Sequence, residues 1–186
     1  MIFPPFSGRA ARCAGGPAAL SGKHFRQPRR IGCRRGGTMN RSFACPDAAA
    51  HVSGGAQHPG LTGTVEFRQR PDGVLVSAHI SGLPQDNTDG FFAFHIHEMG
   101  DCAGDGFPST GGHYDPVGLP HPRHAGDLPP LLSCHGKAQL TVLTDRFRVR
   151  DVVGRSVVIH SSPDDLHSQP SGNSGSKIAC GTIRPM

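Results

Sequence analysis

The chain has 186 residues, of which 26 are glycine and 17 are proline, and it contains no tryptophan. This length predicts one domain, and this composition favours short strands joined by turns over helices. No apolar run approaches the roughly 20 residues that a membrane-spanning helix needs, so we expect a soluble protein with no membrane partner.

The formal net charge of +5 comes from the N-terminal segment. Residues 1–46 contain nine of the 19 lysines and arginines and no acid, which leaves 10 basic against 14 acidic side chains in residues 47–186. A nucleic-acid partner would depend on that segment alone, and we expect none.

We interpret residues 1–46 as a disordered basic tail, outside a single domain at 47–186. Three alternatives remain open: a translation start at Met39, an organelle-targeting peptide, or a basic binding arm. The segment lacks the apolar core of about 7–15 residues that a secretory signal requires. We therefore expect a cytoplasmic protein, with organelle targeting as the alternative.

Short strands begin near residue 48. An edge strand is expected at 48–53, and the Pro71–Asp72–Gly73 turn predicts a hairpin between strands 62–68 and 74–80. The remaining expected strands are 91–97, 128–133, 137–143, 155–160 and 177–183. About eight strands without a convincing helix predict an all-β sandwich or barrel.

Two long polar segments interrupt this strand pattern, at 98–126 and 161–176. Loops of this length inside a compact domain usually carry function. The first one is rich in glycine, proline, histidine and aspartate, which makes it a candidate for part of a binding site.

Alternation in the strand at 91–97 places Phe92, Phe94 and Ile96 on one face, and His95 and His97 on the other. The first face is therefore expected in the core. The second carries two imidazoles that are close enough to chelate one ion.

Further metal-binding side chains lie outside this strand. His160 ends the strand at 155–160, and the first long loop contributes His113, His121, His124 and Asp127. If the two strands are neighbours, six histidines and one carboxylate converge. Imidazole suits copper and zinc, and a His/Asp set suits tetrahedral zinc. The other histidines, which have no partner in a motif, are interpreted as surface or tail residues: His24, His51, His58, His79, His135 and His167.

At these residues the chain resembles the copper/zinc superoxide dismutase family, over about residues 48–184. The matching motifs, in order, are GFFAFHIHE at 90–98, GGHYDP at 111–116, HAGDL at 124–128, GRSVVIH at 154–160, DDL at 164–166 and GNSGSKIACG at 172–181. The resemblance implies an eight-stranded Greek-key β-barrel, an immunoglobulin-like sandwich with two long functional loops.

The resemblance also implies roles for individual residues. Copper is expected on His95, His97, His113 and His160, and zinc on His113, His121, His124 and Asp127. His113 would bridge the two metals, and Asp164 would orient one histidine of each metal. Lys177 stands where the family usually has arginine, and His121 and His124 lie closer together than in most members.

The resemblance further implies a Cys102–Cys180 disulfide, because Cys180 occupies the place of the family's bonded cysteine. We expect Cys13, Cys33 and Cys45 to be free, and Cys134 to end a strand as a small apolar residue.

The implied function is dismutation of superoxide to dioxygen and hydrogen peroxide, with Lys177 and His113 as the catalytic residues. Superoxide is the expected partner, together with a second copy in a homodimer and a copper chaperone. The alternatives are a non-catalytic copper-binding or chaperone-like module of the same fold, and a zinc hydrolase. A hydrolase needs a general base beside an open zinc, whereas the expected zinc ligand set is closed.

Overall fold

The computed structural model describes residues 45–87 and 89–186. The expected basic tail at 1–46 lies outside these residues except for its last two positions. His24 and the alternative translation start at Met39 also lie outside them. Among the described residues, no helix is long and apolar enough to cross a membrane.

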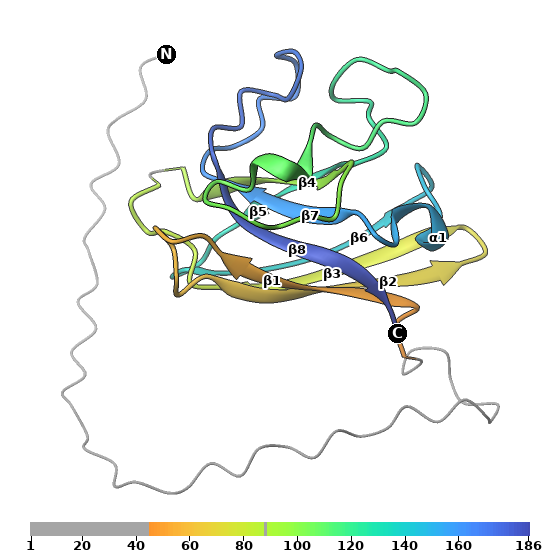
Figure 1. Ribbon diagram of the computed structural model, residues 1–186, viewed down its shortest axis with the longest axis horizontal. Coiled ribbons are helices and arrows are strands. Elements are labelled where there is room, and N and C mark those ends of the chain that lie inside the picture. Colours follow the sequence, from red (N-terminus) through yellow and green to blue (C-terminus); the bar gives the residue numbers. More distant parts are fainter. Residues whose placement is uncertain (1–44, 88) are drawn as a thin grey trace, which may run out of the picture. The chain divides into compact units, whose positions relative to one another are not determined.

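Eight antiparallel strands form one sheet, in the order β5-β4-β7-β8-β1-β2-β3-β6 (Figure 1). The strands are β1 (Ala48–Gly54), β2 (Thr62–Arg70), β3 (Gly73–Ser81), β4 (Phe91–His97), β5 (Asp127–Leu132), β6 (Lys137–Thr144), β7 (Ser156–His160) and β8 (Lys177–Pro185). The sheet curls so that β5 and β6, at the two ends of this order, lie against each other. The expected all-β Greek-key barrel is confirmed.

The Greek-key topology brings distant segments of the chain together. β3 pairs with β6, although β4 and β5 lie between them in sequence, and β7 lies between β4 and β8. The β7–β4 pairing is the one that the histidine site requires. β1 pairs with both β2 and β8, so the expectation that it is an edge strand is wrong.

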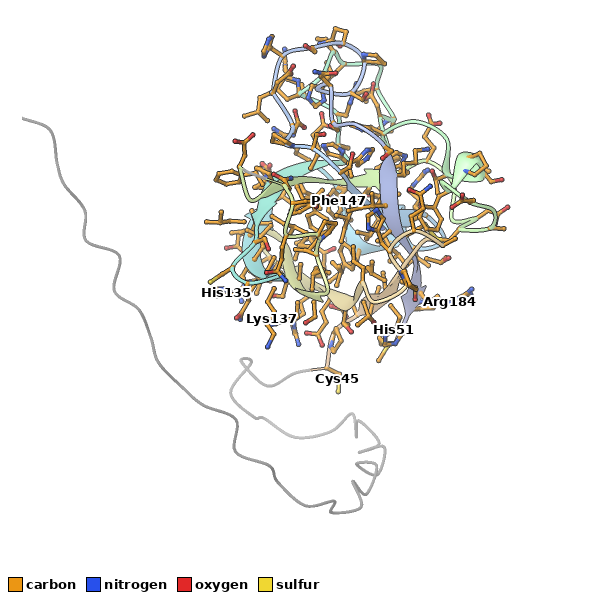
Figure 2. The ribbon with its side chains drawn as sticks, turned by 90° about the vertical axis from the view of Figure 1, so that its left-hand side faces the viewer. Cys45, His51, His135, Lys137, Phe147 and Arg184 are labelled. Carbon is orange, nitrogen blue, oxygen red and sulfur yellow. A yellow bond between two sulfur atoms is a disulfide. The ribbon has the colours of Figure 1, made fainter. Side chains whose placement is uncertain are left out.

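The barrel interior holds the apolar face of each strand. Phe67, Phe92 and Phe94 are completely buried in one cluster, together with Ile159 and Ile183. Burying each such side chain stabilises the fold by about 1.5–3 kcal/mol. Phe147 packs against Phe67 and lies inside the barrel (Figure 2).

In the described part of the chain, two short helical turns accompany the strands: the 3-10 turn η2 (Pro108–Thr110) and the helix α1 (Val149–Val152). The first belongs to the loop at 98–126, and the second to the connection between β6 and β7. Both long loops, 98–126 and 161–176, lie on the same side of the barrel, above β4, β7 and β8 in Figure 1. This placement makes them the cover of the histidine face of β4.

Candidate metal centre

The strand β4 is buried on both faces. Phe92, Phe94 and Ile96 belong to the barrel core, as the alternation predicts. His95 and His97 point the other way and are still only 0% and 1% exposed. Two imidazoles are therefore removed from water on the outer face of the barrel, where only the long loops can cover them.

Backbone pairing holds the first loop against β4. The amide of Tyr114 donates to Ile96 O at 2.8 Å, and the amide of Ile96 donates to Gly126 O at 2.9 Å. A Cβ atom on Gly126 would lie 2.2 Å from Ile96 O, so only glycine allows this approach. His113 forms a β-bridge with His97, which brings it beside the histidines of β4.

His160 enters the site from the end of β7. β7 pairs directly with β4, and a register shift between Ile159 and His160 turns the last residue of the strand. His97 Nε2 and His160 Nε2 lie 3.2 Å apart. One ligand atom from each of four buried histidines falls within 4.8 Å of the others: His95, His97, His113 and His160. We call these residues the four-histidine group.

A second group shares His113 with the first. Its ligand atoms also lie within 4.8 Å of one another, and its members are His113, His121, His124 and Asp127. His113 Nδ1 is 2.8 Å from Asp127 Oδ1, while His121 Nδ1 and His124 Nδ1 lie 3.1 and 3.2 Å from Asp127 Oδ2. We call these residues the His/Asp group. The structure thus brings together all seven expected ligands.

Asp164 connects the two groups. Its carboxylate accepts hydrogen bonds from His95 Nε2 at 2.8 Å and His121 Nε2 at 2.9 Å, and from the amide of Leu166 at 2.7 Å. Burial raises the pKa of Asp164, but these hydrogen bonds outweigh it and hold the pKa well below its usual value. Asp164 is therefore ionised, and it orients one histidine from each group as expected.

Gly172 leaves the space that this connection needs. Its φ of +68° lies in the left-handed region, and an added Cβ would stand 2.0 Å from Asp164 Oδ1 and 2.7 Å from His121 Nε2. Any larger residue would displace the carboxylate or the imidazole.

The hydrogen bonds leave lone pairs directed into the site. His97 Nδ1 and His160 Nδ1 face the carbonyl oxygens of Gly111 and Gly175 and donate to them, so both Nε2 atoms present lone pairs across 3.2 Å. Buried ring nitrogens without a hydrogen-bond partner also occur on other members of the groups, namely His95 Nδ1, His113 Nε2, His121 Nδ1 and His124 Nδ1. The Nδ1 atoms of His121 and His124 lie near Asp127 Oδ2, but the angles do not allow a hydrogen bond. A short distance is not sufficient for a hydrogen bond. Lone pairs that face one another or a carboxylate fit metal cations between them.

Burial keeps three members of the four-histidine group, His95, His97 and His160, neutral. It lowers the pKa of His97 to about 2 and that of His160 to about 3, against an ordinary value of 6.5. Burial also lowers the pKa of His95, although the hydrogen bond with Asp164 opposes this. Neutral imidazole is the form that ligates a metal, so the ligands are prepared for binding near neutral pH.

Asp127 is ionised in the His/Asp group. Burial raises its pKa, but the hydrogen bond with His113 and the nearby His121 and His124 more than compensate, so the pKa is lowered. A carboxylate and three imidazoles make a closed set of four ligands. Such a set is typical of a zinc ion that does no redox chemistry.

Lys177 begins β8, beside His160, and its ammonium turns toward η2. Nζ donates to Thr110 Oγ1 at 2.7 Å and to Gly111 O at 3.0 Å. Partial burial lowers the pKa of Lys177. The cation is thereby held at one place near the four-histidine group.

The Cys102–Cys180 disulfide is present in the structure, with the two Cα atoms 5.7 Å apart. It joins the first loop to β8, three residues after Lys177, and Phe107 packs against it beside Val158. Cys45 is disulfide-bonded, so the expectation of a free thiol there is wrong, whereas Cys13 and Cys33 lie outside the described residues. Cys134, expected to end a strand, is free and exposed in the turn that follows the end of β5 at Leu132.

Sequence reasoning missed three side chains around the site. Arg146 and Gln169 hydrogen-bond to the backbone of residues 121–127, and Thr110 accepts from Lys177. No sequence signal separates Arg146 from its neighbours Arg148 and Arg150, because its partners are carbonyl oxygens that are distant in sequence.

The remaining described histidines take no part in either group. His51 and His135 lie in the lower part of Figure 2, on the side of the barrel away from the two long loops. His79 and His167 are exposed, and His58 is half-buried in the turn before β2. Their interpretation as residues outside the site agrees with their positions.

Comparison with known proteins points to one family. A family model described as copper/zinc superoxide dismutase matches residues 61–183. The Cu-Zn superoxide dismutase 2 of Aquifex aeolicus (strain VF5) is 37% identical over 139 residues, which are 67% of this chain and 80% of that protein. An extracellular Cu-Zn superoxide dismutase of Rattus norvegicus is 37% identical over 133 residues, or 66% of this chain and 54% of its own length. The chain thus spans about half of the rat protein.

A solved structure is also similar. The crystal structure of a SOD-like protein from Bacillus subtilis covers 72% of this chain and 95% of that one, with a TM-score of 0.61 and 28% sequence identity.

Proposed function

This chain belongs to the copper/zinc superoxide dismutase family, and on that premise we propose which of its residues hold each metal. Copper lies in the four-histidine group, because imidazoles alone suit a redox-active copper ion. Zinc lies in the His/Asp group, because a carboxylate with three imidazoles suits a tetrahedral zinc ion. We call residues 121–127, which carry three of these ligands, the zinc segment.

The activity is dismutation of superoxide to dioxygen and hydrogen peroxide, with copper and zinc as cofactors. When bound, copper supplies one-electron redox chemistry and zinc supplies a fixed positive charge. The protein's own side chains must attract the superoxide anion, orient the metal ligands and hold a proton.

We assign to His113 the role of taking up and releasing a proton during the reaction. It is the one member common to both groups, with Nδ1 beside Asp127 and Nε2 buried without a protein partner. A zinc ion held by the His/Asp group would keep the ring of His113 in place, so that its Nε2 would stay at one position to take up or release a proton. This shared histidine is the observation that carries the proposal.

Lys177 and Asp164 have complementary tasks. The ammonium of Lys177 attracts superoxide to the four-histidine group, and long-range attraction of this kind raises the rate of encounter. Asp164 orients His95 and His121 at once, so the two sites keep a fixed geometry relative to each other.

The test is a superoxide assay on the purified full-length chain after loading with both metals, with metal content measured on the same sample. We expect activity with about one copper and one zinc per chain. His95→Ala should abolish activity and reduce bound copper, whereas His79→Ala, at an exposed position of β3, should leave both unchanged. Loaded protein without activity above buffer would leave the non-catalytic copper-binding module as the better description.

Two partners are also proposed. The copper ligands are buried, which supports delivery of copper by a chaperone over capture from dilute solution. A homodimer is supported by the exposed apolar side chains of Phe91 and Leu132, which pair on β4 and β5. Sedimentation equilibrium of the loaded protein tests the dimer. Copper transfer measured with and without a Cu(I)-binding donor protein tests the chaperone.

A further inference from the structure

Arg146, just after β6, reaches the backbone of the zinc segment. Its Nη1 donates to the carbonyl oxygens of Pro122, His124 and Asp127 at 3.1, 3.2 and 3.1 Å. A guanidinium nitrogen carries two hydrogens, so one of them is shared between two of these three acceptors. One side chain from a different part of the chain thus contacts three carbonyl groups that are spread along the ligand-bearing segment.

The opposite end of the zinc segment is held separately. Gln169, from the loop at 161–176, accepts from the amide of His121 at 3.0 Å and donates to its carbonyl oxygen at 2.7 Å. Gly126 pairs with the first loop and β4, since its amide donates to Tyr114 O at 2.8 Å and its carbonyl oxygen accepts from the amide of Ile96 at 2.9 Å. The amide of Asp127 donates within the segment, to His124 O at 3.2 Å. Gln169 therefore fixes His121, whereas Arg146 supplies contacts from outside the segment to the carbonyl groups of His124 and Asp127.

We propose that Arg146 is a positioning residue for the zinc site, holding His124 and Asp127 in the orientation that binds the metal. The inference rests on the zinc assignment proposed above. Mutation of a side chain that hydrogen-bonds to metal ligands, without touching the metal, commonly weakens metal binding by about 10–100-fold.

The charge of Arg146 opposes this effect, because a cation near a zinc ion disfavours its binding. Arg146 is exposed to solvent, so water and salt screen its charge. The three hydrogen bonds act directly on the backbone of the zinc segment, two of them on ligand residues, and are not screened in this way. We therefore expect fixation of the backbone to outweigh repulsion, and loss of Arg146 to weaken zinc binding.

The experiment measures the zinc dissociation constant of the copper-free, full-length chain by competition with a chromogenic chelator. Arg146→Gln should bind zinc about 10-fold more weakly or worse. The matched control is Arg150→Gln, which removes the same charge from the exposed side of α1, where Arg150 pairs with Asp151. The control should stay within about two-fold of the unmodified chain.

Hydrogen exchange in the zinc-loaded protein gives a second readout, which general destabilisation would not reproduce. In Arg146→Gln the amides of His124 and Asp127 should exchange faster, while the amide of His121, bonded to Gln169, should keep its protection. Arg146→Lys keeps the charge without the planar fork and should fall between the unmodified chain and Arg146→Gln.

Equal zinc affinity in Arg146→Gln and Arg150→Gln would overturn the inference, as would equal loss of protection at all three amides. Failure of the unmodified chain to bind zinc would instead overturn the zinc assignment, and this inference with it. If the unmodified chain binds zinc and only the effect of Arg146 is missing, the proposed function stands and the positioning role does not.

Discussion

The Lys177 ammonium and the Thr110 hydroxyl form a hydrogen bond of 2.7 Å, and Thr110 is completely buried. The hydroxyl in turn donates to Phe107 O at 2.9 Å, so its lone pairs are turned toward the ammonium. A lysine lacks the planar fork with which an arginine is held at two points. The buried hydroxyl supplies one of the fixed acceptors that hold the cation here.

Thr110→Val should therefore lower kcat/KM for superoxide. The loss of one hydrogen bond to a charged group is expected to cost about three- to ten-fold in rate. Thr110→Ser keeps the hydroxyl and should remain within about two-fold of the unmodified enzyme. Equal rates for the valine and serine variants, measured at low ionic strength, would show that the hydroxyl has no part in placing the charge.

The sign of the charge at Lys177 should decide the salt dependence of the reaction. Lys177→Glu should slow turnover strongly and make it faster with added salt, since screening then relieves repulsion of the anion. Lys177→Arg should preserve or raise the rate and keep the usual decline with salt. The measurement is kcat/KM over a range of ionic strength, and an unchanged rate in the glutamate variant would remove Lys177 from the mechanism.

His113→Ala should disturb both metals at once, because His113 belongs to both ligand groups. We expect a changed visible spectrum for bound copper and a zinc affinity that is at least about 10-fold weaker. His124→Ala, which removes a ligand from the His/Asp group alone, is the control and should weaken zinc with a smaller effect on the copper spectrum. A response of only one metal to His113→Ala would contradict the shared histidine.

The metal-free protein should lose stability as the pH falls below about 6.5. In the unfolded chain His97 and His160 take up protons near pH 6.5, whereas in the folded protein their pKa values are about 2 and about 3. The unfolded state then binds more protons, so the free energy of unfolding falls as pH decreases from about 6.5 toward 3. The slope is at most about 1.4 kcal/mol per pH unit for each histidine.

Urea unfolding of the metal-free chain at several pH values between about 7 and 4 measures this slope. His97→Gln removes one of the two titrating groups and should flatten the dependence. His79→Gln, at an exposed position, should leave it unchanged. A free energy of unfolding that is constant over this range would refute the buried, neutral state of the histidines.

The Cys102–Cys180 disulfide should stabilise the domain and preserve the position of the first loop. It closes a separation of 78 residues, for which chain entropy predicts about 4–5 kcal/mol as an upper figure. Cys102→Ala together with Cys180→Ala should lower the free energy of unfolding by up to this amount. The double variant should also lose activity, because the first loop, which carries Phe107 and Thr110, would no longer be tied to β8. Peptide mapping under non-reducing conditions checks the bond, and two alkylated thiols in active, fully metallated protein would rule it out.

Period-two alternation in the sequence determined the strands and the two faces of β4. Phe92, Phe94 and Ile96 alternate with His95 and His97, and a strand converts that alternation into a core face and a ligand face. The positions of the two long loops followed from the absence of such a pattern. Each of these features depends on local spacing, which a sequence records directly.

Tertiary structure alone decided the features that depend on pairing between distant segments. β1 lies inside the sheet because β8 returns to pair with it. Arg146 and Gln169 contact the zinc segment through its backbone atoms, which are the same in every type of residue. Thr110 meets Lys177 only because the first loop is fixed against β4 and β8. The sequence thus determined which side chains are the candidate metal ligands, and the folded chain decided what holds them in place, because hydrogen bonds to backbone atoms are specified by geometry and not by residue type.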